Sequence, residues 1–118
     1  MGSEAMHEPR EKVSGEVVDA HRAYNSLIEE LDAVNWYNQR ADATENETLR
    51  EILIHNRDEE MEHACMLLEW LRRHQDGWHE KLKTYLFREG NITELEEEAE
   101  SEEGENERAD LGIGKPAK

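Results

Sequence analysis

Two long helical patterns joined by a very short polar link dominate this sequence. From about Val13 to Ala43, apolar residues recur at spacings of three and four, which is the period of one face of an α-helix. A second pattern of the same kind runs from about Glu47 to His74. Because only residues 43–47 connect them, two such helices must pack antiparallel. The sequence therefore predicts an all-α fold built on an antiparallel two-helix hairpin.

The sequence changes character after this hairpin. A shorter C-terminal helix is expected from Trp78 onward, and Thr93 and Glu96 have the spacing of a capping box for a final helical turn or two. Nine of the fourteen residues from 94 to 107 are Glu, and so acidic a segment buries too little apolar area to offset the entropy of ordering it. We therefore expect an N-terminal lead-in over residues 1–12, a helical domain over 13–96, an acidic disordered linker over 97–110 and a short terminal peptide over 111–118.

The composition limits both the core and the partners. The chain has 118 residues, of which 36% are hydrophobic, so one domain with a thin core for a monomer is expected. A formal net charge of −16 repels nucleic acid and anionic membrane surfaces and attracts cations. No apolar run approaches the roughly 20 residues that span a bilayer, and no secretion signal is visible. The single Cys65 excludes an internal disulfide, so a reducing cytoplasmic setting fits best.

Glu60 and His63 are the residues of the hairpin that least fit a plain apolar core. They form a Glu-x-x-His motif, and both fall within the apolar stripe of the second helix, among Leu53, Ala64 and Leu67. Removing an unpaired carboxylate from water is costly, so such a group needs a partner charge, a shifted pKa or a metal ion. A Glu and a His at i and i+3 can bind one ion together, because they lie side by side on one helix face.

The first helix offers one carboxylate that faces the same core. On a helical wheel, Glu30 lies along the apolar stripe with Tyr37. Glu29 and Asp32 point elsewhere, near Trp36. Glu30 is therefore the candidate ligand from this helix.

One chain thus supplies half of a known kind of metal centre. Carboxylate-bridged di-iron bundles use two plain Glu ligands and two Glu-x-x-His pairs from four helices, whereas this chain offers Glu30, Glu60 and His63 from two. Pairing two chains with twofold symmetry completes both the ligand set and a four-helix bundle. A two-metal site would then lie on the dimer axis, with its ions about 3.5–4 Å apart. Such oxygen and nitrogen ligands suit Fe(II), Mn(II) or Zn(II).

The pattern alone leaves other interpretations open. Glu60 and His63 also fit a buried hydrogen bond at a helix interface, and Glu29 and Asp32 also fit an ordinary solvated face. Trp36 and Tyr37 also fit a plain packing role. Correspondingly, the chain could be a metal-dependent enzyme, a non-catalytic metal-binding protein or an all-α dimerisation module.

Seven short stretches, in order between about residues 7 and 96, match a family. They are His7-Glu8-Pro9, His21-Arg22-Ala23, Ile28-Glu29-Glu30-Leu31, Ala33-Val34-Asn35-Trp36-Tyr37, His55-Asn56-Arg57-Asp58-Glu59-Glu60-Met61-Glu62-His63-Ala64, Leu68-Glu69-Trp70-Leu71-Arg72-Arg73 and Thr84-Tyr85-Leu86-Phe87. On these stretches the chain resembles the encapsulated ferritins, ferritin-like proteins carried as cargo inside encapsulin shells. The resemblance implies a ferritin-like protomer that forms homodimers, with five dimers closing into an open ring.

The same resemblance implies an activity and a role for each candidate residue. The activity is that of a ferroxidase, which oxidises Fe(II) to Fe(III) with O2 at a di-iron site and delivers the iron for storage in the shell. In the family, the positions that match Glu30, Glu60 and His63 bind iron at the ferroxidase centre. The positions of Trp36 and Tyr37 lie beside that centre. The positions of Glu29 and Asp32 form a metal entrance site. The family more often has Glu where this chain has Asp32, which implies a weaker or shifted entrance site.

The end of the chain resembles the peptides that address cargo to encapsulin. Leu111-Gly112-Ile113-Gly114 fits the first half of such a peptide, whereas Lys115-Pro116 departs from the second half. We expect residues 111–118 to bind the encapsulin shell protein and to place the chain inside an encapsulin nanocompartment in the cytoplasm. The alternative is a low-complexity tail with no such role.

Overall fold

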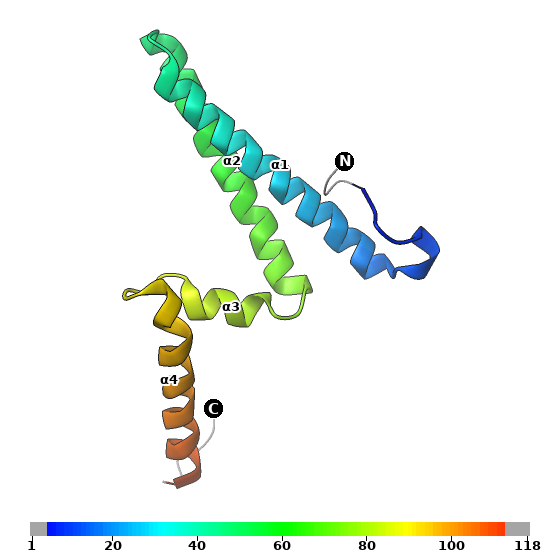
Figure 1. Ribbon diagram of the computed structural model, residues 1–118, viewed down its shortest axis with the longest axis vertical. Coiled ribbons are helices and arrows are strands. Elements are labelled where there is room, and N and C mark those ends of the chain that lie inside the picture. Colours follow the sequence, from blue (N-terminus) through cyan, green and yellow to red (C-terminus); the bar gives the residue numbers. More distant parts are fainter. Residues whose placement is uncertain (1–4, 113–118) are drawn as a thin grey trace. The chain divides into compact units, whose positions relative to one another are not determined.

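The computed structural model describes the backbone of residues 5–112 and the side chains of residues 5–104. Within this part of the chain every regular element is helical, and no strand occurs (Figure 1). The elements are, in order, the 3-10 helix η1 (Arg10–Lys12), α1 (Gly15–Ala43), α2 (Glu47–His74), α3 (Trp78–Tyr85), the 3-10 helix η2 (Ile92–Glu94) and α4 (Leu95–Gly112). The predicted all-α fold class is therefore confirmed. The chain divides into two compact units, with the boundary between Asp76 and Gly77.

Polar caps set the ends of the hairpin helices. The Ser14 side chain accepts a hydrogen bond from the Val17 backbone N–H at 3.2 Å and begins α1. The Asn46 side chain does the same for the Leu49 N–H at 2.9 Å and begins α2. Only residues 44–46 lie between the helices, and the extended backbone of Thr44 ends α1. The predicted ranges of both helices agree with the structure to within two residues at each end.

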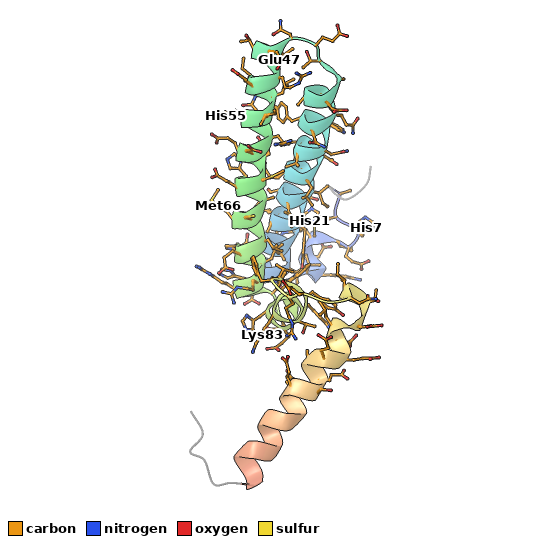
Figure 2. All side chains as sticks on the ribbon, turned by 90° about the vertical axis from the view of Figure 1, so that its left-hand side faces the viewer. His7, His21, Glu47, His55, Met66 and Lys83 are labelled. Atoms are coloured by element: carbon orange, nitrogen blue, oxygen red, sulfur yellow. The ribbon has the colours of Figure 1, made fainter. Side chains whose placement is uncertain are left out.

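Small side chains allow α1 and α2 to pack closely along the hairpin. The two helices lie side by side, with His55 and Met66 on the side of α2 that faces away from α1 (Figure 2). The buried residues of the two helices are Val18, Ala20, Ala23 and Ala41 on α1, and Ala64 and Leu71 on α2. An interface lined mainly by alanine brings the two backbones near each other, so side chains that reach across it need not be long.

The hairpin leaves many large apolar side chains exposed in the single chain. On α1 and α2 they are Val17, Ile28, Leu31, Trp36, Leu49, Ile52, Met61 and Met66. Large contiguous apolar patches usually mark an interface, whereas single exposed apolar side chains are common on soluble proteins. Among the described residues, no helix combines the length and apolar character that crossing a membrane requires.

The second unit differs from the prediction in its acidic part. Gly77, with φ +94°, precedes α3, and Leu95 at the start of α4 is fully buried. Residues 97–110, expected as a disordered linker, lie within helix α4. The expectation considered only buried apolar area, whereas Glu is a good helix former and Glu96, Glu97 and Glu98 in the first turn favour the positive end of the helix dipole.

Two further details concern the ends of this unit. Thr93 does not begin a capping box, because it lies inside η2, whose cap is the Asn91 side chain. Arg88 pairs with Glu98 and Glu102 of α4, at 3.9 and 3.0 Å. Residues 113–118, which hold most of the expected targeting peptide, lie outside the described residues, and Leu111 and Gly112 end α4.

Candidate metal centre

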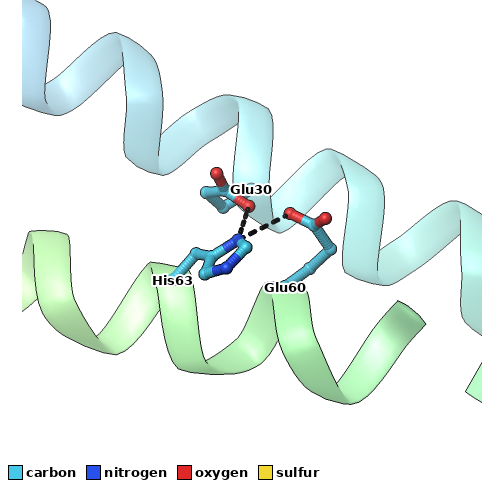
Figure 3. A group of neighbouring side chains, drawn as sticks. All are labelled: Glu30, Glu60 and His63. Atoms are coloured by element: carbon cyan, nitrogen blue, oxygen red, sulfur yellow. Dashed lines mark ion pairs between the residues drawn. The ribbon is translucent and has the colours of Figure 1, made fainter. Parts of the chain in front are cut away.

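Three side chains from the two hairpin helices meet at one point (Figure 3). Glu30 comes from the middle of α1, and Glu60 and His63 come from adjacent turns of α2. One potential ligand atom from each residue lies within 4.8 Å of the others. The Nδ1 atom of His63 is 3.4 Å from Oε2 of Glu30 and 3.5 Å from Oε2 of Glu60. The structure thus brings together the three residues that the sequence predicts as metal ligands.

The helical repeat explains why these residues face one another. Glu60 lies seven residues from both Leu53 and Leu67, so it shares a helix face on which the equivalent positions two turns before and after it are leucine. Glu30 lies seven residues from Ala23 and Tyr37 on α1 in the same way. His63 follows Glu60 by three residues, which keeps the imidazole on the same side of α2. Two carboxylates and an imidazole therefore replace apolar side chains at one level of the hairpin.

The burial of this group creates an unmet demand for a cation or a proton. The Glu30 and Glu60 side chains are only 23% and 24% exposed, and Oε2 of Glu30 is buried without a hydrogen-bond partner. A buried carboxylate oxygen with no partner is costly, and each unsatisfied group of this kind costs about 1–3 kcal/mol. A divalent ion at the meeting point of the three side chains would satisfy this atom, and two carboxylate oxygens and an imidazole nitrogen are ligands that Fe(II), Mn(II) and Zn(II) accept. The residues present therefore fit a bound metal ion.

The group is open on one side within a single chain. The His63 side chain is 41% exposed, although the two carboxylates beside it are mostly covered. Three protein ligands leave coordination positions unfilled on an ion that prefers four to six ligands. One protomer therefore offers a partial coordination sphere that faces outward.

The other predicted site residues do not join this group. Glu29 and Asp32 are exposed on α1 and contribute no atom to the three-residue cluster. Trp36 is exposed and lines a shallow hollow with Gln39 and Arg40, and the Arg40 guanidinium lies 5.6 Å from the centre of the Tyr37 ring. The roles of these four predicted residues therefore remain predictions.

Two residues that were not predicted from the sequence join the helices of the hairpin near this group. Arg57 donates a hydrogen bond from Nη1 to Oδ1 of Asn38 at 3.0 Å, which joins α2 to α1. A signal was available, because Arg57 lies seven and fourteen residues before the buried Ala64 and Leu71 and so shares their side of α2. An arginine at that position must reach a polar partner on the facing helix or bend out to water.

The helical hairpin and its carboxylate–imidazole group define a ferritin-like protein. The family model EncFtn-like matches residues 5–89, which is most of the chain. The chain belongs to this family, as its resemblance to the encapsulated ferritins predicts.

Individual relatives agree with this assignment. A "Ferritin-like protein" of Thermotoga maritima is 59% identical over 109 residues, which cover 92% of this chain and 95% of the relative. An "Encapsulated ferritin-like protein" of Rhodospirillum rubrum is 51% identical over 115 residues, covering 98% of this chain and 81% of the relative. An "Encapsulin nanocompartment cargo protein EncC" of Myxococcus xanthus is 40% identical over 65 residues, which cover 55% of this chain and 48% of that protein.

A solved structure agrees with the fold. The crystal structure of protein ne0167 from Nitrosomonas europaea superposes with a TM-score of 0.72 and 51% sequence identity. The match covers 75% of this chain and 97% of the solved one. The ferritin-like helical architecture is therefore shared with a protein of known structure.

Proposed function

We propose that this chain is a ferroxidase whose di-iron site forms between two protomers. The observation that carries the proposal is the cluster of Glu30, Glu60 and His63, with the buried Oε2 atom of Glu30 lacking any hydrogen-bond partner. A buried carboxylate oxygen without a hydrogen bond is expected where a cation binds. Membership of an encapsulated ferritin-like family makes iron the cation to expect.

Pairing of two chains would complete the site. One chain offers three ligands on an open face, and twofold symmetry doubles this to the two Glu and two Glu-x-x-His ligands of carboxylate-bridged di-iron bundles. The same pairing would bury apolar side chains that a single hairpin exposes, such as Leu49 and Ile52. We further propose that dimers of this kind assemble into a ring of ten chains.

The ligands suit the oxidation of iron. Fe(II) is the substrate, and the imidazole of His63 would help to hold it while the carboxylates of Glu30 and Glu60 favour the harder Fe(III) product. Two Fe(II) ions lose one electron each, and one O2 molecule accepts both electrons together with two protons to give hydrogen peroxide.

Residues around the centre would serve delivery and packing. Glu29 and Asp32 are exposed carboxylates one turn apart on α1, and we propose that they attract incoming Fe(II) as an entrance site. Trp36 and Tyr37 follow one turn later and would lie beside the di-iron site in the dimer.

The names of the relatives support an encapsulin shell as the partner. The Rhodospirillum rubrum relative is called encapsulated and the Myxococcus xanthus relative is called an encapsulin cargo protein. We propose that residues 111–118 bind the shell protein and that the chain works inside an encapsulin nanocompartment, where Fe(III) collects.

Iron-dependent oxygen uptake tests the proposed activity. Purified metal-free protein should consume O2 when Fe(II) is added, and His63→Ala should reduce the initial rate at least tenfold. Glu62→Ala removes a charged residue from an exposed position of the same helix and serves as the control, with a rate near that of the unmodified chain. Metal that binds without oxygen uptake would favour a non-catalytic binding protein, and no bound metal at all would favour a dimerisation module.

A further inference from the structure

The proposed metal centre depends on the axial register of α1 against α2. We propose that Arg57 is a positioning residue that fixes this register. Glu30 reaches the site from one helix, whereas Glu60 and His63 reach it from the other. No covalent bond holds the two helices at this level. The inference rests on the proposed metal centre, because it concerns how the same three ligands are held in place.

The site is sensitive to small displacements of one helix along the other. A slip by one residue moves Glu30 along the helix axis by about 1.5 Å. Metal–ligand distances are set to within about 0.2 Å, so such a slip exceeds the tolerance of the site. Rotation of the glutamate side chain can recover part of the displacement, and the expected consequence is weaker binding rather than complete loss.

Apolar packing alone specifies this register poorly. Alanines make up most of the fully buried residues of the hairpin, whereas Leu53 and Leu67 on the facing stripe of α2 are only half-buried in the single chain. Short side chains form shallow ridges, which resist sliding less than large interdigitated ones do. On the turn side of the metal centre, the packing also leaves a hollow of about 250 Å3 between α1 and α2. This hollow is lined by Asn38, Ala41, Asp42, Arg50, Ile54 and Arg57. Polar contacts across the hairpin therefore have more influence here than apolar side chains do.

Arg57 makes such a contact one helical turn from the ligands. Its Nη1 atom donates a hydrogen bond to Oδ1 of Asn38 at 3.0 Å. Asn38 lies on α1, two turns beyond Glu30. Its Nε and Nη2 atoms donate to Oδ1 of Asp58 at 3.2 and 3.1 Å, which holds the guanidinium in one orientation. A guanidinium oriented on one edge by Asp58 meets Asn38 with good geometry over a limited range of helix positions, although these contacts are exposed to solvent.

Arg50 makes a different kind of contact nearer the turn. Its Nε atom donates to the Ala41 carbonyl oxygen at 2.9 Å, and its Nη2 atom donates to the Thr44 carbonyl oxygen. These bonds hold the last residues of α1 to the first turn of α2. Arg57 lies two turns further along α2, so it acts on the part of the hairpin that carries the metal ligands.

Binding of Co(II) to the full-length protein tests the inference. Co(II) resists oxidation by air, so its visible absorption reports binding without turnover. Arg57→Gln should weaken Co(II) binding about tenfold, the lower end of the effect seen when groups that orient metal ligands are removed. The direction of the change in Co(II) affinity distinguishes positioning from electrostatics, because removal of a nearby positive charge would by itself strengthen the binding of a cation. Arg22→Gln, which breaks a pair with Asp19 within α1 alone, should leave the affinity unchanged.

A second variant separates positioning from other effects of the substitution. Asn38→Leu removes the other half of the contact without changing charge, and it should weaken Co(II) binding to a similar degree. The double variant should bind Co(II) as tightly as either single variant, because all three variants lose the same contact. Circular dichroism and sedimentation, recorded under the titration conditions, should give the same helicity and oligomeric state for each variant.

The outcomes separate this inference from the function it rests on. If the unmodified chain binds no Co(II), Mn(II) or Fe(II), the metal centre itself is refuted. If the unmodified chain binds Co(II) and both Arg57→Gln and Asn38→Leu bind it equally well, only the positioning role is refuted. Weaker binding in both single variants, with no further loss in the double variant, would support the role.

Discussion

Oε2 of Glu30 on α1 lies 3.4 Å from Nδ1 of His63 on α2, buried and without a hydrogen bond. This pair joins the two helices of the hairpin at the level where Glu60 also approaches, 3.5 Å from the same nitrogen. Without metal, the arrangement leaves a carboxylate oxygen shielded from water and without a hydrogen bond, although the imidazole of His63 lies close to it. The protein therefore gives up stability in the metal-free state at the position where it can hold a cation.

Replacing Glu30 by leucine should test that cost. The metal-free Glu30→Leu variant is expected to unfold with a free energy equal to the unmodified chain or about 1–2 kcal/mol higher, because an unsatisfied buried polar atom is removed. Ferroxidase rate should fall sharply in the same variant. Denaturant unfolding at matched protein concentration measures the first quantity, with Glu29→Leu on the exposed side of α1 as the control. A loss of more than about 2 kcal/mol would mean that Glu30 already has a favourable partner without metal.

The proposed entrance residues should affect delivery and not the centre. Glu29→Ala and Asp32→Ala are expected to change how the oxidation rate depends on Fe(II) concentration, because they remove exposed negative charge near the site. The amount of metal bound at saturation should stay the same. Stopped-flow oxidation at several Fe(II) concentrations gives the first result and metal analysis gives the second. Loss of bound iron at saturation in either variant would show that these residues are ligands of the centre.

Glu69 provides a pH-dependent contribution elsewhere on α2. Hydrogen bonds from Arg72 and from Arg73 lower the pKa of its carboxyl group to about 2. A lowered folded-state pKa stabilises the fold above the unfolded value near 4.5, and this contribution is lost as the pH falls toward 2. Glu69→Gln should therefore lower the melting temperature slightly at pH 7, with the difference shrinking below about pH 4.5. Thermal melts across this range measure it, and a difference that stays constant down to pH 2 would argue against the assignment.

The end of the chain should matter for location and not for chemistry. Deletion of residues 109–118 is expected to leave oxygen uptake unchanged, because the proposed ligands all lie on α1 and α2. The same deletion should abolish packaging, since Leu111 and Ile113 are the large apolar side chains available to a docking peptide in this segment. Co-expression with the shell protein, followed by counting cargo in purified shells, measures this. Undiminished loading would place the address elsewhere in the chain.

Periodicity explains how much of this structure the sequence predicts. The ranges of α1 and α2 follow from apolar spacing and the short link, and the facing of Glu30, Glu60 and His63 follows from their places in those repeats. A final helical turn or two was expected near Glu96, but the length of α4 was not, because an argument from buried area says nothing about the local helical preference of glutamate. The contact between Arg57 and Asn38 was not predicted, because the apolar period of each helix does not determine the axial register between the two helices.

Counting iron and chains in the same solution tests the central claim most directly. Fe(II) added without oxygen to the metal-free chain should bind at one ion per chain and should promote or tighten a dimer, because the complete ligand set exists only when two chains meet. Sedimentation with iron analysis of each species measures both quantities at once. The account predicts that iron travels with dimers or larger assemblies. A monomer that binds one iron tightly, with no change in its assembly state, would contradict it.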